Sequence, residues 1–126
     1  MTASAAADAT LALVQGFEAA FNRHDVDALM AAMTEDCVFE IVAPAERGGG
    51  RWEGQAAVRT AWTGLEEAFP GYVFETEDVF ACGDRCAYRW TLRWDRSGGG
   101  RGRIRGIDTY TVRDGKIARK YTYFAR

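Results

Sequence analysis

The sequence has few of the residues from which metal centres and disulfide frameworks are built. Its 126 residues include one histidine and three cysteines. A structural zinc site takes four ligands, and the closest cysteine pair, Cys82 and Cys86, lacks a second ligand pair to complete it. An odd number of cysteines favours free thiols in a reducing compartment. We therefore expect no metal ion and no other cofactor.

The sequence also lacks a long hydrophobic run and a strong charge of either sign. Polar residues interrupt the apolar ones in residues 1–14, which contain no basic segment, so this stretch is typical neither of an export signal nor of a membrane span. The formal net charge is only -2, whereas nucleic-acid binding usually requires a basic surface. We expect a cytoplasmic protein that binds neither nucleic acid nor membrane.

Hydrophobic residues, in contrast, are abundant. They make up 48% of the chain, and aromatic residues make up 13%, which is enough for a well-filled core. A chain of this length buries about two thirds of its unfolded surface and has room for one core only. The sequence therefore predicts a single globular domain over residues 1–126.

Apolar residues recur with helical spacing in the amino-terminal half. Residues 8–23 and 55–69 each place an apolar stripe along one side of a helix. Asp25 is suited to cap a second, shorter helix, in which Met33 faces inward and which ends at residues 34–36.

The other segments have the composition of strands. In residues 86–95, Cys86 and Trp90 fall on one face while Arg89 and Arg93 fall on the other, so one face is buried and the opposite face is wet or at an interface. Helices followed by a run of strands predict an α+β fold, with the helices on one face of a mostly antiparallel sheet. The expected strands are residues 37–42, 72–81, 86–95, 103–113 and 117–125, and residues 43–54 are an expected loop. The side chains expected to form ion pairs across the outer face are Arg89, Arg93, Arg103 and Arg105 with Glu75, Glu77 and Asp95.

Three passages, taken in order, resemble the nuclear transport factor 2-like superfamily and, within it, the SnoaL-like branch. They are FNRHDVDALMAAMTEDCVFE before the first strand, WEGQAAVRTAW at the start of the third helix, and RGIDTYTVRDGKIARKYTYF near the end. The resemblance covers nearly the whole chain. It implies a cone in which a strongly curved sheet wraps around the amino-terminal helices and leaves an internal pocket. It also implies a homodimer formed through the sheet face.

Asp108 is the candidate catalytic residue. It shares one side of its expected strand with Ile104 and Tyr110, and a carboxyl group among apolar neighbours either finds a partner or holds its proton. The resemblance places Asp108 where ketosteroid isomerases keep the acid that donates to a forming enolate oxygen. The alternative is a structural acid that is bonded to the backbone or to an arginine.

Other catalytic positions of these relatives are not retained. The resemblance places the base of ketosteroid isomerases at Ile41 and their oxyanion tyrosine at Phe17, so a true ketosteroid isomerase is not expected. Glu40 could replace the base only if a bulge shifts its strand, because in a regular strand it points away from Ile41. Residues 121–125 lack the acid that the epoxide hydrolases carry in their last strand.

The aromatic residues suit a flat, apolar ligand with one or two polar groups, although they also suit ordinary core packing. A buried tyrosine hydroxyl needs a partner, which makes Tyr88 and Tyr110 candidates for orienting the ligand. The lone histidine, His24, is expected in an exposed turn. The expected substrate-binding residues are Tyr88, Trp90, Tyr110, Trp62, Phe17, Ile41 and Tyr123.

Three functions remain open, since one fold supports many chemistries. The first is a cofactor-independent acid/base enzyme of isomerase, cyclase or dehydratase type that acts on a small apolar substrate, with Asp108 as the acid or oxyanion donor. The second is a module that binds such a molecule without changing it. The third is a dimeric accessory domain that works through the sheet face. Whether the protein is an enzyme is undecided at this level.

Overall fold

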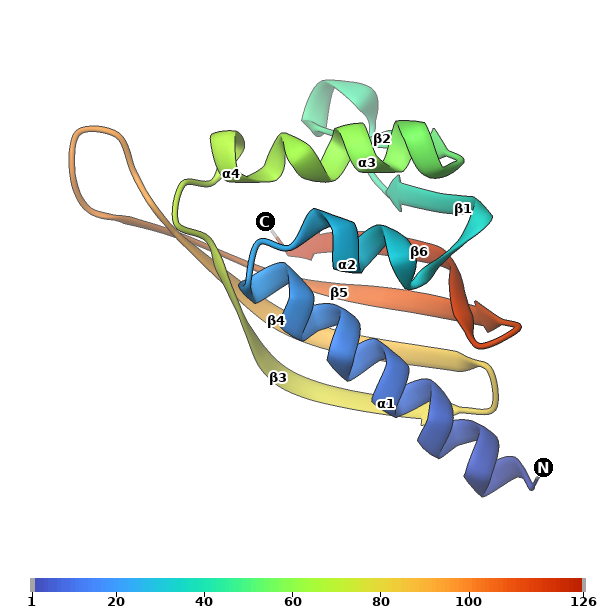
Figure 1. Ribbon diagram of the computed structural model, residues 1–126. Helices are drawn as coiled ribbons and strands as arrows, with labels where there is room; N and C mark the ends of the chain where they lie inside the picture. The colour runs from blue at the N-terminus through green and yellow to red at the C-terminus, as the bar shows by residue number, and fades with distance from the viewer. Residues whose placement is uncertain (1, 126) are drawn as a thin grey trace.

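The computed structural model describes residues 2–125 and consists of amino-terminal helices packed on a curled sheet (Figure 1). The first helix, α1 (Ala3–Asn22), begins at the side chain of Thr2, whose hydroxyl accepts a hydrogen bond from the Ala5 backbone. The other elements are α2 (Val26–Ala31), β1 (Met33–Ile41), the short 3-10 helix η1 (Ala45–Arg47), β2 (Gly50–Glu53), α3 (Gln55–Thr63), α4 (Leu65–Ala68), β3 (Val73–Cys82), β4 (Arg85–Asp95), β5 (Arg101–Arg113) and β6 (Lys116–Ala125).

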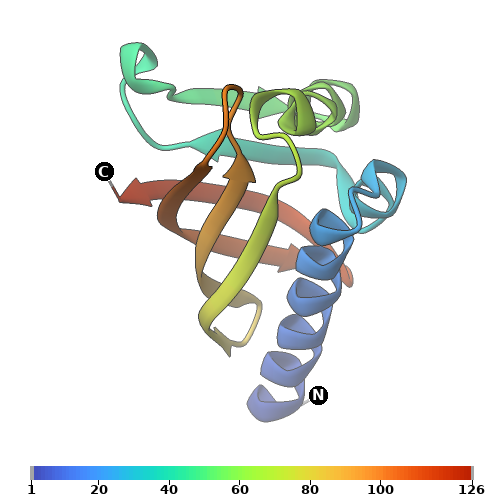
Figure 2. The same cartoon turned by 90° about the vertical axis from the view of Figure 1, so that its left-hand side faces the viewer.

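The six strands form one sheet in the order β2-β1-β6-β5-β4-β3. Neighbouring strands are antiparallel except for β1 and β6, which run parallel. The sheet curls around the helices without closing, because β2 and β3 remain at its two edges (Figure 2). The α+β class and the curved, mostly antiparallel sheet that the sequence predicts are confirmed.

Two tryptophans of β4 lie over glycines of the neighbouring β5. Trp90 pairs with Gly106 and Trp94 pairs with Gly102, and a Cβ atom added at either glycine would collide with the facing indole ring. Glycine therefore lets a large ring lie against the backbone of the next strand. This arrangement fixes Trp90 on the inner face of the sheet.

The two faces of β4 divide as the sequence predicts. Cys86, Tyr88 and Trp90 are buried on the inner face. On the outer face, Glu77 contacts both Arg89 and Arg105, and the pairing of Glu75 with Arg93 is also formed. The expected outer layer of cross-strand ion pairs is confirmed for these residues.

Strand β1 begins at Met33, so the expectation that Met33 belongs to the second helix is wrong. Asp25 caps α2 as predicted, since its side chain accepts a hydrogen bond from the Ala28 backbone. The helix nevertheless ends after six residues, because the carbonyl oxygen of Ala32 accepts a hydrogen bond from Ile117. Pairing with β6 thus ends the helix and begins a strand at residues where the local spacing predicts more helix.

Strand β2 lies inside the expected loop 43–54, and Gly64 divides the expected helix 55–69 into α3 and α4. The four residues of β2 include two charged ones, so their composition did not indicate a strand. It is formed by pairing with β1 and by the ring of Trp52, which stacks on Phe39 with 5.2 Å between the centroids.

Among residues 2–125, no helix is both long and apolar enough to span a bilayer. Within the same part of the chain, no three His, Cys, Asp or Glu side chains are grouped so that they could hold a metal ion. Cys37 and Cys86 are buried and Cys82 is exposed, and all three thiols are free.

Candidate functional site

A cavity of about 200 Å³ lies between the inner face of the sheet and the helices α1, α3 and α4. Phe21, Trp62 and Trp90 are among its walls, and nearly all of the lining is apolar. The exceptions are near the middle of β6, where Lys120 is the only charged residue in the described part of the chain that lines the cavity, and Thr122 adds a hydroxyl group. The polar groups of the cavity are therefore gathered at one place on its wall.

Lys120 is held inside the protein by aromatic rings and by a carboxylate. The residue as a whole is only 5% exposed. The ammonium lies 4.8 Å from the ring centroid of Phe39 and 5.3 Å from that of Phe21, so it makes cation–π contacts with both rings. Nζ also lies 3.3 Å from Oδ2 of Asp108 and donates a hydrogen bond of 3.1 Å to the Thr122 hydroxyl.

Asp108 lies directly behind these two residues rather than in the cavity lining. It pairs with Thr122 across β5 and β6, and its residue is 1% exposed. Its Oδ1 accepts a hydrogen bond of 2.7 Å from the Thr122 hydroxyl, while Oδ2 faces Lys120. A buried carboxylate requires such partners, so Asp108 is positioned to orient Lys120 and Thr122.

Glu18 of α1 is a second buried acid in the same cluster. It is hydrogen-bonded to the hydroxyl of Tyr110. Burial chiefly raises the pKa of Glu18 from 4.5 to about 8, the charge of Asp108 adds to the rise, and Lys120 and Tyr110 oppose it. Burial also raises the pKa of Tyr110 well above 10, as do the neighbouring acids. Burial thus favours the protonated form of Glu18.

Glu18 also lines a second hollow, which shares no lining residue with the cavity. This hollow is lined by Gln15, Glu18, Ala19, Asn22, Thr76, Val79 and Tyr88 and has a volume of about 200 Å³. The buried polar groups thus form a continuous series. It runs from Lys120 and Thr122 at the cavity through Asp108 and Tyr110 to Glu18 at the second hollow.

Three of the expected substrate-binding residues, Trp90, Trp62 and Ile41, do line the cavity. Phe17 belongs to the aromatic core, where its ring packs against that of Trp62 with 5.5 Å between the centroids. Tyr110 lies deeper, in the polar cluster. The structure brings this second pair close to the cavity but not into its lining.

Tyr88 and Tyr123 lie away from the cavity. The Tyr88 hydroxyl is hydrogen-bonded to Thr76 beside the second hollow, and Tyr123 is 39% exposed on the outer face. Glu40 also faces outward, where it forms an ion pair with Arg51 at 2.7 Å. The only irregularity in the pairing of β1 with β6 precedes Val38 among the described residues, so no bulge turns Glu40 inward.

The outward position of Tyr123 has a specific cause. Thr111 pairs with Arg119 while Val112 pairs with Ile117, so Ala118 is an extra residue in β6. Such a bulge reverses which side chains face inward. Counting alternate residues from Ile117 therefore gives the wrong face for the second half of the strand.

The same bulge explains why sequence reasoning missed Lys120 and Thr122. Regular alternation from Ile117 places both on the outside, although both are buried. Glu18 could have been found, because it lies four residues after Val14 and three before Phe21, on the predicted apolar stripe of the first helix. A lone acid on such a stripe indicates a buried partner.

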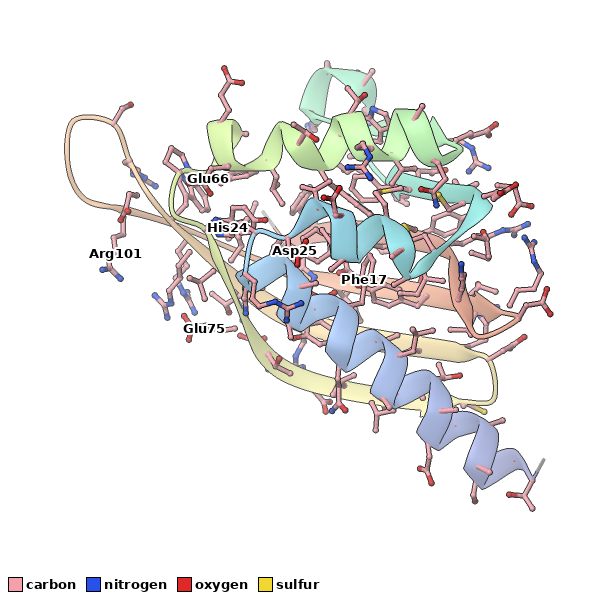
Figure 3. All side chains as sticks on the ribbon, viewed as in Figure 1. Phe17, His24, Asp25, Glu66, Glu75 and Arg101 are labelled. Atoms are coloured by element: carbon pink, nitrogen blue, oxygen red, sulfur yellow. The ribbon has the colours of Figure 1, made fainter. Side chains whose placement is uncertain are left out.

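His24 links the α4 wall of the cavity to the start of β3 (Figure 3). Its ring stacks on Tyr72 with the centroids 4.1 Å apart. Nε2 lies 2.9 Å from the Tyr72 carbonyl oxygen, and Nδ1 lies 3.2 Å from Oε2 of Glu66. His24 is partly exposed, as expected, and it also holds the helix that contributes Leu65 and Ala68 to the cavity lining.

The sequence profile of the SnoaL-like domain matches residues 14–120. A nuclear transport factor 2-like protein of unknown function from Mesorhizobium loti is 30% identical, with a TM-score of 0.77 over 95% of this chain and 93% of that one. A putative polyketide cyclase from Xanthomonas campestris pv. campestris is 25% identical, with a TM-score of 0.78 over 95% and 93% of the two chains. A putative ketosteroid isomerase from Kribbella flavida is 18% identical, with a TM-score of 0.77 over 95% and 80%. A comparison with curated proteins finds no match.

Proposed function

The chain belongs to the SnoaL-like family, and from this premise we propose that it is a cofactor-independent acid/base enzyme of isomerase, cyclase or dehydratase type. Its substrate is a small, flat, largely apolar molecule with a carbonyl group. The observation that carries the proposal is Lys120, the single charged residue among residues 2–125 that lines a largely apolar cavity. Relatives of known structure include a putative polyketide cyclase, which is consistent with this class of reaction.

The size of the cavity limits the ligand. Filled at the packing density of protein interiors, ~0.75, a cavity of about 200 Å³ holds roughly a dozen non-hydrogen atoms. Two fused six-membered rings with one small substituent match that size. The rings of Trp62 and Trp90 in the lining suit such a flat molecule.

Lys120 would hold the substrate oxygen. When a proton leaves the carbon beside a carbonyl group, negative charge develops on the oxygen, and a preorganised cation in a site without water stabilises that charge. The Thr122 hydroxyl is a neighbouring polar contact. Asp108 would act as a positioning residue, because it contacts Lys120 and Thr122 but does not line the cavity.

A module that binds its ligand without changing it is the second candidate. The observation that favours it is that no carboxylate side chain lines the cavity among residues 2–125. An enzyme of the proposed type needs a base as well as an oxyanion donor. Binding, in contrast, needs only the apolar walls and the polar contact at Lys120.

A matched pair of compounds tests the proposal. Because a ligand that binds the folded state raises its stability, 2-acetylnaphthalene should raise the melting temperature more than 2-ethylnaphthalene, which lacks the oxygen. The difference should vanish in Lys120→Met. If neither compound gives a saturable shift, the cavity is not a site for this class of molecule.

Deuterium exchange separates the enzyme from the binding module. In D₂O, the enzyme should accelerate exchange at the acetyl methyl group of bound 2-acetylnaphthalene, as followed by proton NMR. Lys120→Met should lose most of this acceleration, and the exposed control Lys116→Met should keep it. Saturable binding with exchange at the buffer rate would establish the binding module instead.

A further inference from the structure

One tyrosine hydroxyl lies between two buried carboxyl groups. The hydroxyl of Tyr110 is hydrogen-bonded to Oε1 of Glu18 and lies 3.4 Å from Oδ2 of Asp108. A tyrosine hydroxyl has a single hydrogen to donate. It can therefore serve only one of the two carboxyl groups, and the other contact is made only if that carboxyl group brings a proton of its own.

The charges in the cluster also indicate one proton for the two carboxyl groups. Two carboxyl groups, Glu18 and Asp108, are buried beside one cation, Lys120. The other titratable groups that face them, Tyr88, Tyr110 and Cys86, are neutral when protonated, and burial raises the pKa of each of them. Two buried negative charges beside one positive charge leave an uncompensated charge. One proton shared by the two carboxyl groups removes it.

The two carboxyl groups differ in their surroundings. Asp108 has Thr122 at one oxygen and Lys120 at the other. Glu18 has Tyr110 as its hydrogen-bond partner and lines the second hollow. With the cavity empty, the negative charge is therefore better held on Asp108, and the proton on Glu18.

We propose that Glu18 and Asp108 share this proton through Tyr110, and that it moves from Glu18 to Asp108 when the cavity holds an anion. The inference rests on the proposed function and narrows the class of ligand that the cavity binds. The cavity would take a small aromatic or alicyclic molecule whose oxygen is anionic, such as a carboxylate, a phenolate or the enolate that forms during turnover.

The transfer is balanced and needs no other reactant. The proton of Glu18 passes to the Tyr110 oxygen as the proton of Tyr110 passes to Oδ2 of Asp108. Afterwards Asp108 is neutral, and the charge of Lys120 is balanced by the anion in the cavity. The negative charge has moved to Glu18, which lines the second hollow and not the cavity. Without this step, the anion and Asp108 would both be charged around a single lysine.

The test uses two probes that differ in charge, 2-naphthoate and the neutral 2-acetylnaphthalene. The carboxyl carbons of Asp and Glu are labelled with ¹³C, and the Glu18 and Asp108 signals are assigned with Glu18→Gln and Asp108→Asn. At pH 7, saturation with 2-naphthoate should move the Glu18 signal to its ionised position and the Asp108 signal to its protonated position. Saturation with 2-acetylnaphthalene should move neither.

Tyr110→Phe tests the route, because it keeps the ring and removes the bridging hydroxyl. This variant should bind 2-naphthoate with the Glu18 signal unchanged. Two results overturn the proposal: Glu18 already ionised in the free protein at pH 6, or 2-naphthoate bound to the unmodified protein with both signals unchanged.

The outcomes also separate this inference from the proposed function. If 2-acetylnaphthalene binds and 2-naphthoate does not, the anion site is refuted while the proposed function stands. If neither probe binds, the proposed function fails and the ligand assignment fails with it.

Discussion

Lys120 and Asp108 form an ion pair on adjacent strands, with 3.3 Å between Nζ and Oδ2, although both residues are buried. Removal of one partner from a buried pair leaves the other charge uncompensated, which is destabilising by about 3–5 kcal/mol. The residue that gives the cavity its charge is thus also tied to the stability of the fold.

Lys120→Met should therefore lower the free energy of unfolding by about 3–5 kcal/mol at neutral pH, as measured by urea denaturation. The double variant with Asp108→Asn should recover part of this loss, because no unpaired charge remains. Lys116→Met, in which the residue is exposed, should change stability little. A double variant as unstable as Lys120→Met alone would show that the loss comes from packing and not from charge.

Glu18 should make the protein less stable as the pH rises. Its folded pKa of about 8 lies above the value of 4.5 taken for an unperturbed glutamate. Between these two values the folded state binds a proton that the unfolded state does not. The free energy of unfolding should then fall by up to about 1.4 kcal/mol for each pH unit between these two pKa values. The stabilisation by the bound proton is fully present below pH 4.5.

Denaturation by urea at several pH values measures this slope, and Glu18→Gln should flatten it. Glu67→Gln, at an exposed position of α4, is the matched control and should leave the slope as it is. An equal slope in Glu18→Gln would assign the pH dependence to other groups.

The sequence predicted the fold more fully than the site, and β6 shows why. Composition alone indicated a strand there, because alternating apolar and polar residues suffice for that. Which residues face the cavity depends on the extra residue Ala118, and the bulge exists only in the pairing of β6 with β5. Lys120 therefore became visible as a cavity residue only through the register of a neighbouring strand.

Local spacing failed in the same way at Met33. Its surroundings favour a helix, whereas the observed strand depends on a hydrogen bond from Ile117, which is distant in sequence. Asp108, in contrast, lies on a regular part of β5 that pairs with β4 without a bulge. Its inward direction could be predicted because the alternation holds there.

Gly106 should not tolerate a side chain. A Cβ atom at this position would meet the ring of Trp90 and the carbonyl oxygen of Tyr123. Overpacking of this kind is destabilising by about 1–3 kcal/mol, so Gly106→Ala should lower the urea midpoint. It should also weaken the binding of 2-acetylnaphthalene, because the displaced Trp90 ring lines the cavity.

Gly16→Ala is the matched control for that variant. Gly16 lies inside α1, and nothing stands within 4 Å of an added Cβ atom. The substitution should stabilise the protein by about 1 kcal/mol, because alanine is the better helix former. If both variants changed stability in the same direction, contact with Trp90 would not be the cause of the Gly106→Ala effect.

The outer face of the sheet should form a homodimer. Ile107 and Tyr123 are 36% and 39% exposed, and they line one shallow hollow together with Arg89 and Arg105. Apolar residues framed by charged ones are common at protein interfaces.

Sedimentation equilibrium should therefore give the mass of a dimer for the unmodified chain. It should give the mass of a monomer for Ile107→Glu, because a dimer would bury the new charge. Thr60→Glu, at an exposed position of α3, should remain dimeric. The prediction is wrong if the unmodified chain is still a monomer at a concentration roughly 100 times a micromolar dissociation constant. The exposed Ile107 would then have no role in assembly.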